Sequence, residues 1–237
     1  MEMQLLLVED IEIARRSVVT IKLEPLDEPV EFERVIQMRG DATLGDVHGA
    51  ATIAMSHHNH HGCSFSTPAN NDERFFRCFY GRKRTQREKD LDLEDGCEVS
   101  IMSLFKNSEE DGFLAYDYKA GDLWELCMSI KIGTFQDEQP WKVTIDGKGA
   151  APPEYCLQTN ATSDIAEAIR SGKNTPELQA ILNGVPWNPD TFDKEEANSR
   201  AAIAFAGGAG AFTESQMPAF DEKAAQLAYD KFNKSLD

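Results

Sequence analysis

The sequence predicts an α+β domain with a largely antiparallel sheet, packed helices and a helical C-terminal part. β-rich runs dominate the chain up to about residue 133, and helical patterns dominate after about residue 160. Strands that precede helices in this way are typical of α+β folds, whereas a parallel sheet would need strands and helices to alternate. No internal repeat is visible in the chain.

The first predicted elements are a strand pair and a helix. Residues 18–38 hold two β-rich runs with turn-forming prolines between them, which is typical of a hairpin or paired strands. Apolar residues then follow at helical spacing, so we expect a helix from about Thr43 to Met55. Asp41 or Thr43 stands where its N-cap belongs.

Five further apolar and aromatic runs predict strands. They are residues 63–67, 74–80, 98–105, 111–118 and 123–133. The third run includes a predicted helical turn around Ser103 and Phe105. The charged segment 81–96 lies between glycines and changes from basic to acidic, so we expect a solvated loop there.

The second half carries the helical patterns. They predict helices at residues 161–170, 175–182 and 192–205. Ser163 is a candidate N-cap, and Pro176 stands at a first helical position. The Gly/Ala-rich run 206–220 predicts a mobile linker to an amphipathic C-terminal helix. The expected organisation is an N-terminal extension (1–17), an α+β domain (18–204), and a linker with a C-terminal helix (205–237).

Charge and hydropathy exclude several classes of protein. The chain has 41 acidic and 24 basic residues, a formal net charge of -17, which argues against an overall nucleic-acid-binding surface. No run approaches the roughly 20 apolar residues that span a bilayer, and the first residues lack a basic leader region. We therefore expect a soluble cytoplasmic protein with no membrane partner, with the nucleus as an alternative compartment. Its five cysteines form no C-x-x-C pair, which favours reduced thiols.

The run SHHNHHG holds four histidines that could ligate a transition metal. They are His57, His58, His60 and His61. Adjacent histidines seldom all reach one ion, and no H-E-x-x-H spacing accompanies them. We therefore favour a polar turn that ends a helix, and we predict no cofactor. A divalent metal is the alternative.

The run YDYKAGDLWEL groups the carboxylates Asp117, Asp122 and Glu125 around Trp124. Paired carboxylates can transfer protons or hold a hard cation. A turn at Gly121 would let Asp117 and Asp122 face each other. The favoured alternative is an ordinary turn rich in Asp and Gly, with Trp124 in the core.

Two other segments are candidate sites. In IDGKGAAPPEYC, the rigid Pro152-Pro153 pair could direct Glu154 toward a pocket, although a stiff surface loop is favoured. The segment GRKRTQREK is locally basic and could contact phosphate or act in nuclear import, but we favour a solvated loop. Its basic residues are Arg82, Lys83, Arg84, Arg87 and Lys89.

Taken in order, the segments resemble the motifs of the plasmid pRiA4b ORF-3-like family. The opening motif is a strand with Pro and Arg followed by a T-L-x-x-L-H-x-x-I helix. Its positions are occupied here by Pro29, Arg34, Thr43, Leu44, Val47, His48, Ile53, Ala54 and Met55. A second motif, Gly-Trp, His-x-His and an aromatic, is kept only in part by His57, His61 and Phe65.

The later motifs also have counterparts. The family's Y-x-Y-D-F-G-D-x-W-E-H corresponds to AYDYKAGDLWEL, with two inserted residues and Leu126 in place of the His. Its D-G-x-x-x-C-P-P-E-D-C-G-G corresponds to IDGKGAAPPEYC, with Ala151 in place of the first Cys. A closing F-D-x-x-x-F-D-x-x-x-x-N is echoed by WNPDTFDKEEAN. The resemblance therefore covers about residues 18–204.

The resemblance implies an α+β fold and no established catalytic residues, although members are passengers of plasmids and transposons and some are labelled resolvases. Co-occurrence of the motifs implies that their loops converge into one polar cleft. The cleft residues are His61, Asp117, Asp122, Trp124, Glu125 and Glu154. We expect a non-enzymatic binding module with an unidentified protein or small-molecule partner. The alternatives are a metal-assisted hydrolase or nuclease-like enzyme, and a mobile-element accessory protein that contacts DNA through the segment from Arg82 to Lys89.

Overall fold

The fold was analysed in a computed structural model of the 237-residue chain. It describes residues 2–26, 32–57, 62–67, 73–105, 112–120, 122–153, 159–173, 175, 176, 178, 182, 187–210 and 212. At residues 2–8, 119, 120, 122–124 and 159–164 only the backbone is described.

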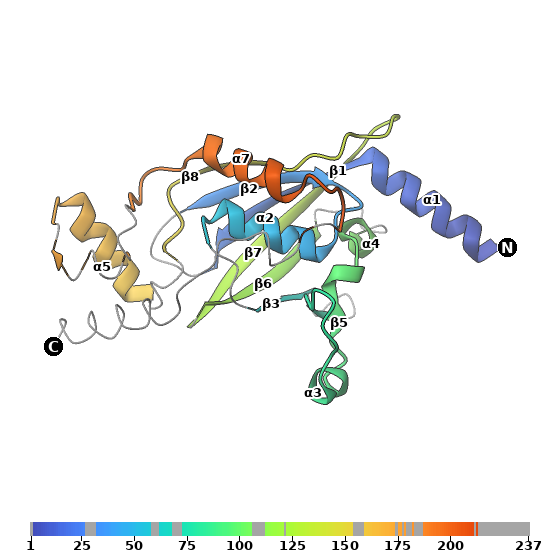
Figure 1. The fold of residues 1–237 in the computed structure, drawn as a ribbon, viewed down its shortest axis with the longest axis horizontal. Coiled ribbons are helices and arrows are strands. Elements are labelled where there is room, and N and C mark those ends of the chain that lie inside the picture. The colour runs from blue at the N-terminus through green and yellow to red at the C-terminus, as the bar shows by residue number, and fades with distance from the viewer. Residues whose placement is uncertain are drawn as a thin grey trace.

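One eight-stranded sheet forms the centre of the molecule (Figure 1), in the order β5-β4-β3-β6-β7-β1-β2-β8. The strands are β1 (Ser17–Pro25), β2 (Glu33–Arg39), β3 (Cys63–Ser66), β4 (Phe75–Arg77), β5 (Glu94–Asp95), β6 (Gly112–Ala120), β7 (Asp122–Thr134) and β8 (Thr144–Lys148). Every pairing is antiparallel except β4 with β5. The predicted α+β class and the largely antiparallel sheet are therefore confirmed.

Helices cover one face of this sheet. The described helices are α1 (Glu2–Arg16), α2 (Leu44–Ala54), α3 (Gln86–Asp90), α4 (Ile101–Phe105), α5 (Thr159–Arg170) and α7 (Lys194–Ala204), with a 3-10 turn η2 (Gly96–Glu98). Helices α2 and α7 lie side by side, with α7 along the edge strand β8, while α1 and α5 extend toward opposite ends of the molecule (Figure 1). None of the helices in the described ranges is long and apolar enough to cross a membrane.

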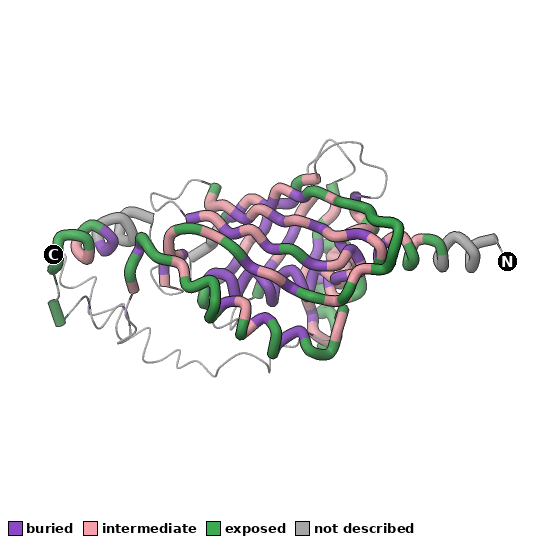
Figure 2. Tube along the Cα trace, turned by 90° about the horizontal axis from the view of Figure 1, so that it is seen from above, coloured by how far each residue is buried: buried purple, intermediate pink, exposed green. Residues whose placement is uncertain are grey.

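The strands are buried on one side only, as their sequence alternation predicts. In β1, Val19, Ile21 and Leu23 are fully buried, and the residues between them are half-buried. The same alternation runs along neighbouring strands (Figure 2). Antiparallel sheets tolerate one solvated face because their polar residues can alternate with the core residues. The core therefore lies between the sheet and α2 with α7.

Helix α2 is the predicted helix from Thr43 to Met55, and Thr43 rather than Asp41 caps it. The Asp46 backbone N–H donates to Thr43 Oγ1 at 3.1 Å, and the Thr43 N–H donates to Asp46 Oδ2 at 2.9 Å. This reciprocal capping box satisfies two N–H groups that the first turn would otherwise leave without partners. Asp41 instead pairs with Arg39. All residues of α2 are buried, so its cap also anchors the core.

Three sequence predictions of local structure are wrong. Residues 98–105 are not a strand, because η2 and α4 fold there, although the predicted turn around Ser103 lies in α4. The predicted loop 81–96 contains helix α3, which Thr85 and Glu88 cap with a second capping box. Helix α5 begins at Thr159 rather than after Ser163. Thr85 and Glu88 form a T-x-x-E capping-box pattern, so the start of α3 could have been predicted from the sequence.

The two chain ends also differ from expectation. The predicted N-terminal extension includes α1, and the predicted linker after residue 204 begins as part of the core. Phe205 and Phe212 are buried and stack on each other with ring centroids 5.4 Å apart. The Gly210 N–H donates to Asp46 Oδ2 at 2.8 Å. Within the described part of the predicted linker, Phe205 and Phe212 therefore pack in the core, whereas residues 206, 207, 209 and 210 are exposed. The predicted C-terminal helix lies outside the described residues.

Strand β8 forms one edge of the sheet, and a single amide side chain covers part of that edge. Asn198 of α7 donates from Nδ2 to the Ile145 carbonyl at 2.6 Å, and its Oδ1 accepts from the Ile145 N–H at 3.0 Å. Exposed edge groups are templates for unwanted strand pairing, so this pair of bonds both fixes α7 and protects the edge.

Replacing Asn198 by alanine is expected to lower the free energy of unfolding by about 1–3 kcal/mol, because both Ile145 groups lose their partner. Urea denaturation monitored by circular dichroism measures the loss. The control is Lys194→Ala on the same helix, whose exposed ion pair with Asp146 contributes at most about 1 kcal/mol. Equal effects of the two substitutions would contradict this role of Asn198.

Candidate functional site

The end of helix α2 places His57 at the centre of the candidate site. Ser56 has a left-handed backbone with φ 60°, its N–H donates to the Ile53 carbonyl, and the His57 N–H donates to the Thr52 carbonyl. These two bonds form a Schellman motif, which reverses the chain and satisfies the last helical carbonyls. His57 is thereby turned back into the protein, where only 1% of it is exposed.

His57 joins two distant segments. Its Nε2–H donates to the Pro152 carbonyl at 3.0 Å, because a carbonyl can only accept. Its ring stacks on Tyr118 of β6, with centroids 5.4 Å apart. The histidine-rich run, the Pro-Pro-Glu segment and the Tyr-Asp-Tyr strand therefore meet at one point.

Two guanidinium groups hold the C-terminal end of α2. Arg34 Nε donates to the Ala54 carbonyl at 2.7 Å, and its Nη1 donates to the Glu33 and Lys148 carbonyls. Arg200 donates to the His57 carbonyl at 3.4 Å. Cations at this end complement the negative pole of the helix dipole. Burial lowers the pKa of Arg34 to about 10 and also lowers the pKa of Arg200. Both guanidinium groups hold backbone carbonyls in place.

A buried polar contact lies beneath the middle of α2. His48 Nδ1 and the Tyr116 hydroxyl are 2.7 Å apart, and both residues are almost fully buried. The His48 ring also lies 5.8 Å from the Tyr118 ring, so this contact leads directly to His57. A buried His and Tyr that satisfy each other cost little to desolvate. They fix the position of α2 over β6.

The strand register decides how the predicted carboxylates pair. Asp117 of β6 stands opposite Glu125 of β7, whereas Asp122 stands opposite Ala120. The expectation that Asp117 faces Asp122 is therefore wrong, because the pairing of Ala120 with Asp122 fixes a register in which Asp117 stands opposite Glu125. Asp117 is half-buried and accepts from Ser64 Oγ at 3.3 Å, and Glu125 is exposed.

Comparison with known sequences decides the family. The sequence pattern of the plasmid pRiA4b ORF-3-like protein matches residues 15–196. The chain belongs to the plasmid pRiA4b ORF-3-like family. Among solved structures, it is similar to the crystal structure of a protein of unknown function, MM3350, from Methanosarcina mazei Go1. That likeness has a TM-score of 0.58 at 19% identity, covers 76% of this chain and 97% of that one, and shows the fold. No curated protein matches the chain.

Several motif positions of the plasmid pRiA4b ORF-3-like family have structural roles in this chain. Thr43 caps α2, Arg34 holds its other end, and His48 contacts Tyr116. Asn198, the last residue of the closing motif, covers the β8 edge. Sequence reasoning missed Arg200 because no local pattern marks an arginine that binds a carbonyl 143 residues away.

The structure describes the other predicted site residues only in part. Of the cleft residues, His61 and Glu154 lie outside the described residues, and only the backbone is described for Asp122 and Trp124. Trp124 is the register partner of Tyr118, whose ring stacks on His57. His58 and His60 also lie outside the described residues. Among the residues that are described, no three His, Cys, Asp or Glu side chains are arranged to hold a metal ion.

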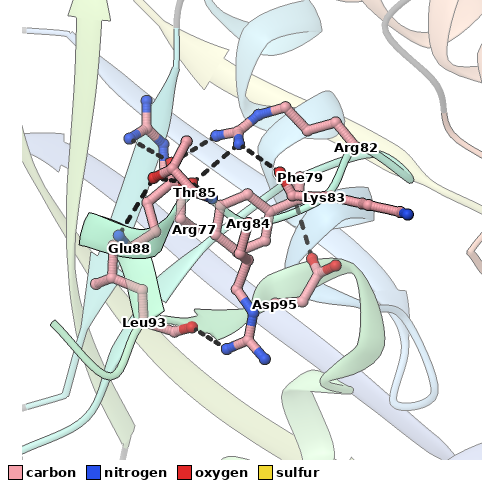
Figure 3. Close-up of polar contacts among 9 residues, drawn as sticks. All are labelled: Arg77, Phe79, Arg82, Lys83, Arg84, Thr85, Glu88, Leu93 and Asp95. Atoms are coloured by element: carbon pink, nitrogen blue, oxygen red, sulfur yellow. Dashed lines mark hydrogen bonds and ion pairs between the residues drawn. The ribbon is translucent and has the colours of Figure 1, made fainter. Parts of the chain in front are cut away.

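The predicted basic loop is organised around one carboxylate, Glu88 (Figure 3). Glu88 accepts from Arg82 at 2.6 and 3.0 Å and from Arg77 at 3.2 Å. Arg82 also lies over the Phe79 ring, and Arg84 donates to the Leu93 carbonyl. The side chains of Lys83, Arg87 and Lys89 are exposed. Two of the five predicted phosphate-binding residues are therefore engaged within the protein.

Acid is expected to open this loop through Glu88. Bonds from Arg82 and the Thr85 backbone hold the pKa of Glu88 below its usual range. A group with a lowered folded-state pKa stabilises the protein above its unfolded-state pKa, and this contribution is lost as the pH falls through the folded-state pKa. Amide hydrogen exchange in α3, corrected for intrinsic rates, should therefore rise below about pH 4.

Glu88→Gln provides the matched control for this pH dependence. The variant cannot ionise at this position, so exchange in α3 should be fast at neutral pH and should change little with acid. If α3 exchanges equally in both proteins at neutral pH, Glu88 does not organise the loop.

A separate groove of about 410 Å³ lies between α7 and the segment before β8. Trp141, Val143, Ala201 and Phe205 contribute to its lining, which is mainly apolar. Apart from Asn198 of the closing motif, the groove is lined by residues outside the motif segments, so it serves as an internal comparison for ligand mapping.

Proposed function

We propose that the chain is an intracellular binding module that recognises a small-molecule or protein ligand in a polar cleft next to His57. The candidate cleft residues are His61, Asp122, Trp124 and Glu154. Asp117 and Glu125 alternate with the core residues Tyr118 and Leu126. Their side chains therefore lie on the face of the sheet opposite His57, and we remove them from the predicted cleft.

The observation that carries the proposal is the position of His57, which contacts Pro152 and Tyr118 simultaneously. Pro152 lies two residues from Glu154, and Trp124 is the register partner of Tyr118.

The described groups around His57 favour binding over catalysis. Arg34 and Arg200 bond to backbone carbonyls, and burial is the main cause of their lowered pKa values. General acids and bases need a proton that can move to a reacting group. These side chains instead fix the loop positions, as the rigid support of a recognition site does.

Nucleic acid is disfavoured as the ligand. The formal net charge is -17, and Arg82 and Arg84 are already bonded within the basic loop. Phosphate contacts release counterions, so a binding constant that falls steeply with salt would point to DNA and against this proposal.

A thermal-shift screen of metabolites and short peptides tests the proposal. At a hundredfold excess over Kd, a ligand stabilises the folded state by about 2.7 kcal/mol, which is measurable as a rise in Tm. The rise should occur for the wild-type chain and be lost in Asp122→Asn and Glu154→Gln. Glu195→Gln, an exposed carboxylate on α7, is the control that should behave as wild type.

Two outcomes would contradict the proposal. If every ligand raised the Tm of all variants equally, the cleft would not be the site. If NMR spectra of the ligand showed chemical conversion over time, the chain would be an enzyme.

A further inference from the structure

Three cysteine thiols lie together beside the first turn of α2. The β3–β4 register ends with Ser64 opposite Arg77. If this register is extended by one residue, Cys63 stands opposite Cys78. Strand β4 pairs with β5 in parallel, with Arg77 beside Asp95, so Cys78 continues alongside Gly96 and Cys97. A Cβ atom at Gly96 would lie 3.1 Å from Cys78 Sγ, which places this sulfur against the residue preceding Cys97.

The three cysteines differ in their exposure to solvent. Cys63 is only 4% exposed. Burial opposes its ionisation, but Cys78 and His48 outweigh burial and lower the pKa of Cys63, so it is burial that keeps this thiol from reagents in solvent. Cys97 is half-buried within η2 and is followed by the exposed Glu98. Reagents from solvent therefore reach Cys97 before they reach Cys63.

The surroundings of Cys97 favour its thiolate. The neighbouring Cys78 thiol and the backbone of Tyr80 lower the pKa of Cys97, although burial opposes them. Tyr80 and Gly81 have positive φ values of 46° and 82°, which form a turn at this point of the chain. Thiolates stabilised in this way are the reactive form of cysteine.

Cys78, in contrast, remains a protonated thiol. The neighbouring Cys63 and Cys97, together with burial, raise the pKa of Cys78. A thiolate beside a protonated thiol is the arrangement that redox-sensing cysteine pairs use.

We propose that Cys97 and Cys78 form a peroxide-responsive dithiol, with Cys97 as the attacking thiol and Cys78 as the resolving thiol. The Cys97 sulfur attacks one peroxide oxygen, the O–O bond breaks, and the leaving oxygen takes a proton from solvent to become water. Cys97 is thereby oxidised to a sulfenic acid. The Cys78 sulfur then attacks the Cys97 sulfur, the S–O bond breaks, and the departing hydroxide takes the Cys78 proton as water. The net change converts two thiols and hydrogen peroxide into one disulfide and two waters.

The test treats the full chain with hydrogen peroxide and maps its peptides under non-reducing conditions. The wild-type protein should lose about 2 Da and yield a linked Cys78–Cys97 peptide pair. Cys78→Ser should accumulate a sulfenic acid on Cys97 that dimedone traps. Cys97→Ser should form neither product, and Cys127→Ser on β7 should behave as wild type.

A second measurement on the unmodified chain does not depend on how the variants fold. At pH 7, iodoacetamide should alkylate Cys97 at least about tenfold faster than Cys127, whose pKa burial raises. Equal alkylation rates, a disulfide between Cys63 and Cys78, or oxidation that persists in Cys97→Ser would each overturn the proposal.

Discussion

Replacing Arg34 by alanine is expected to lower the free energy of unfolding by about 3–5 kcal/mol, one of the two largest effects that we predict. The substitution leaves the carbonyls of Ala54, Glu33 and Lys148 without this donor. It also removes a guanidinium that packs 4.1 Å from the centre of the Phe192 ring. Urea denaturation of the purified variant, monitored by circular dichroism and by tryptophan fluorescence, measures the loss.

Two control variants separate this role from a general effect of charge. Arg34→Lys should recover only part of the loss, because an ammonium cannot reproduce the planar fork that reaches three carbonyls. Arg170→Ala removes an exposed arginine paired with Asp190 and should cost at most about 1 kcal/mol. A loss below that of Arg170→Ala would show that Arg34 does not hold the end of α2.

Replacing Gly147 by alanine is expected to cost about 3 kcal/mol or more, because the new methyl group has no space. A Cβ atom at Gly147 would lie 2.3 Å from the Glu33 carbonyl oxygen and 2.9 Å from Arg34 Cδ. The Glu33 oxygen belongs to the backbone of β2, so the β2–β8 pairing would have to separate. Thermal unfolding and amide exchange in β8 measure the effect.

Gly133→Ala is the matched control within the same sheet. Its new Cβ would meet nothing closer than 3.7 Å, and alanine costs less conformational entropy than glycine. We expect this substitution to change the free energy of unfolding by less than about 1 kcal/mol. If the two glycine variants were equally stable, the predicted clash between a Cβ atom at residue 147 and β2 would be contradicted.

Local physical chemistry explains which parts of the fold could be predicted from the sequence. The cap at Thr43 and the antiparallel pairing of β1 with β2 depend on neighbouring residues, and both are confirmed. Helix α3 carried a local signal in its capping box that was outweighed by the charge of the segment.

The remaining features depend on contacts between distant residues. Nothing near Arg34 in the chain indicates that it binds the Lys148 carbonyl, and nothing near Phe212 indicates that it packs on α2 at Gly49. The pairing of Asp117 with Glu125 depends on the register across Gly121. The thiol cluster of Cys63, Cys78 and Cys97 is likewise created by the β3–β4–β5 pairing, so spacing alone could not reveal it.

The family motifs therefore divide into two kinds of residue. Arg34, Thr43, His48 and Asn198 build the scaffold through contacts that the structure describes. Asp122, Trp124 and Glu154 belong to the motif segments that meet near His57, and the proposed binding module uses them for ligand recognition.

In the proposed binding module the motif segments around His57 form one recognition site. Backbone-amide NMR mapping of fragment binding tests this most directly. A fragment library is titrated into the isotope-labelled full chain, with His57→Gln as the comparison. The proposal predicts hits that shift the amides of Gly62, Asp117, Glu125 and Ala151 together in the wild type and not in the variant. Hits confined to the groove at Trp141 and Phe205, or no shift in any of the three segments, would contradict it.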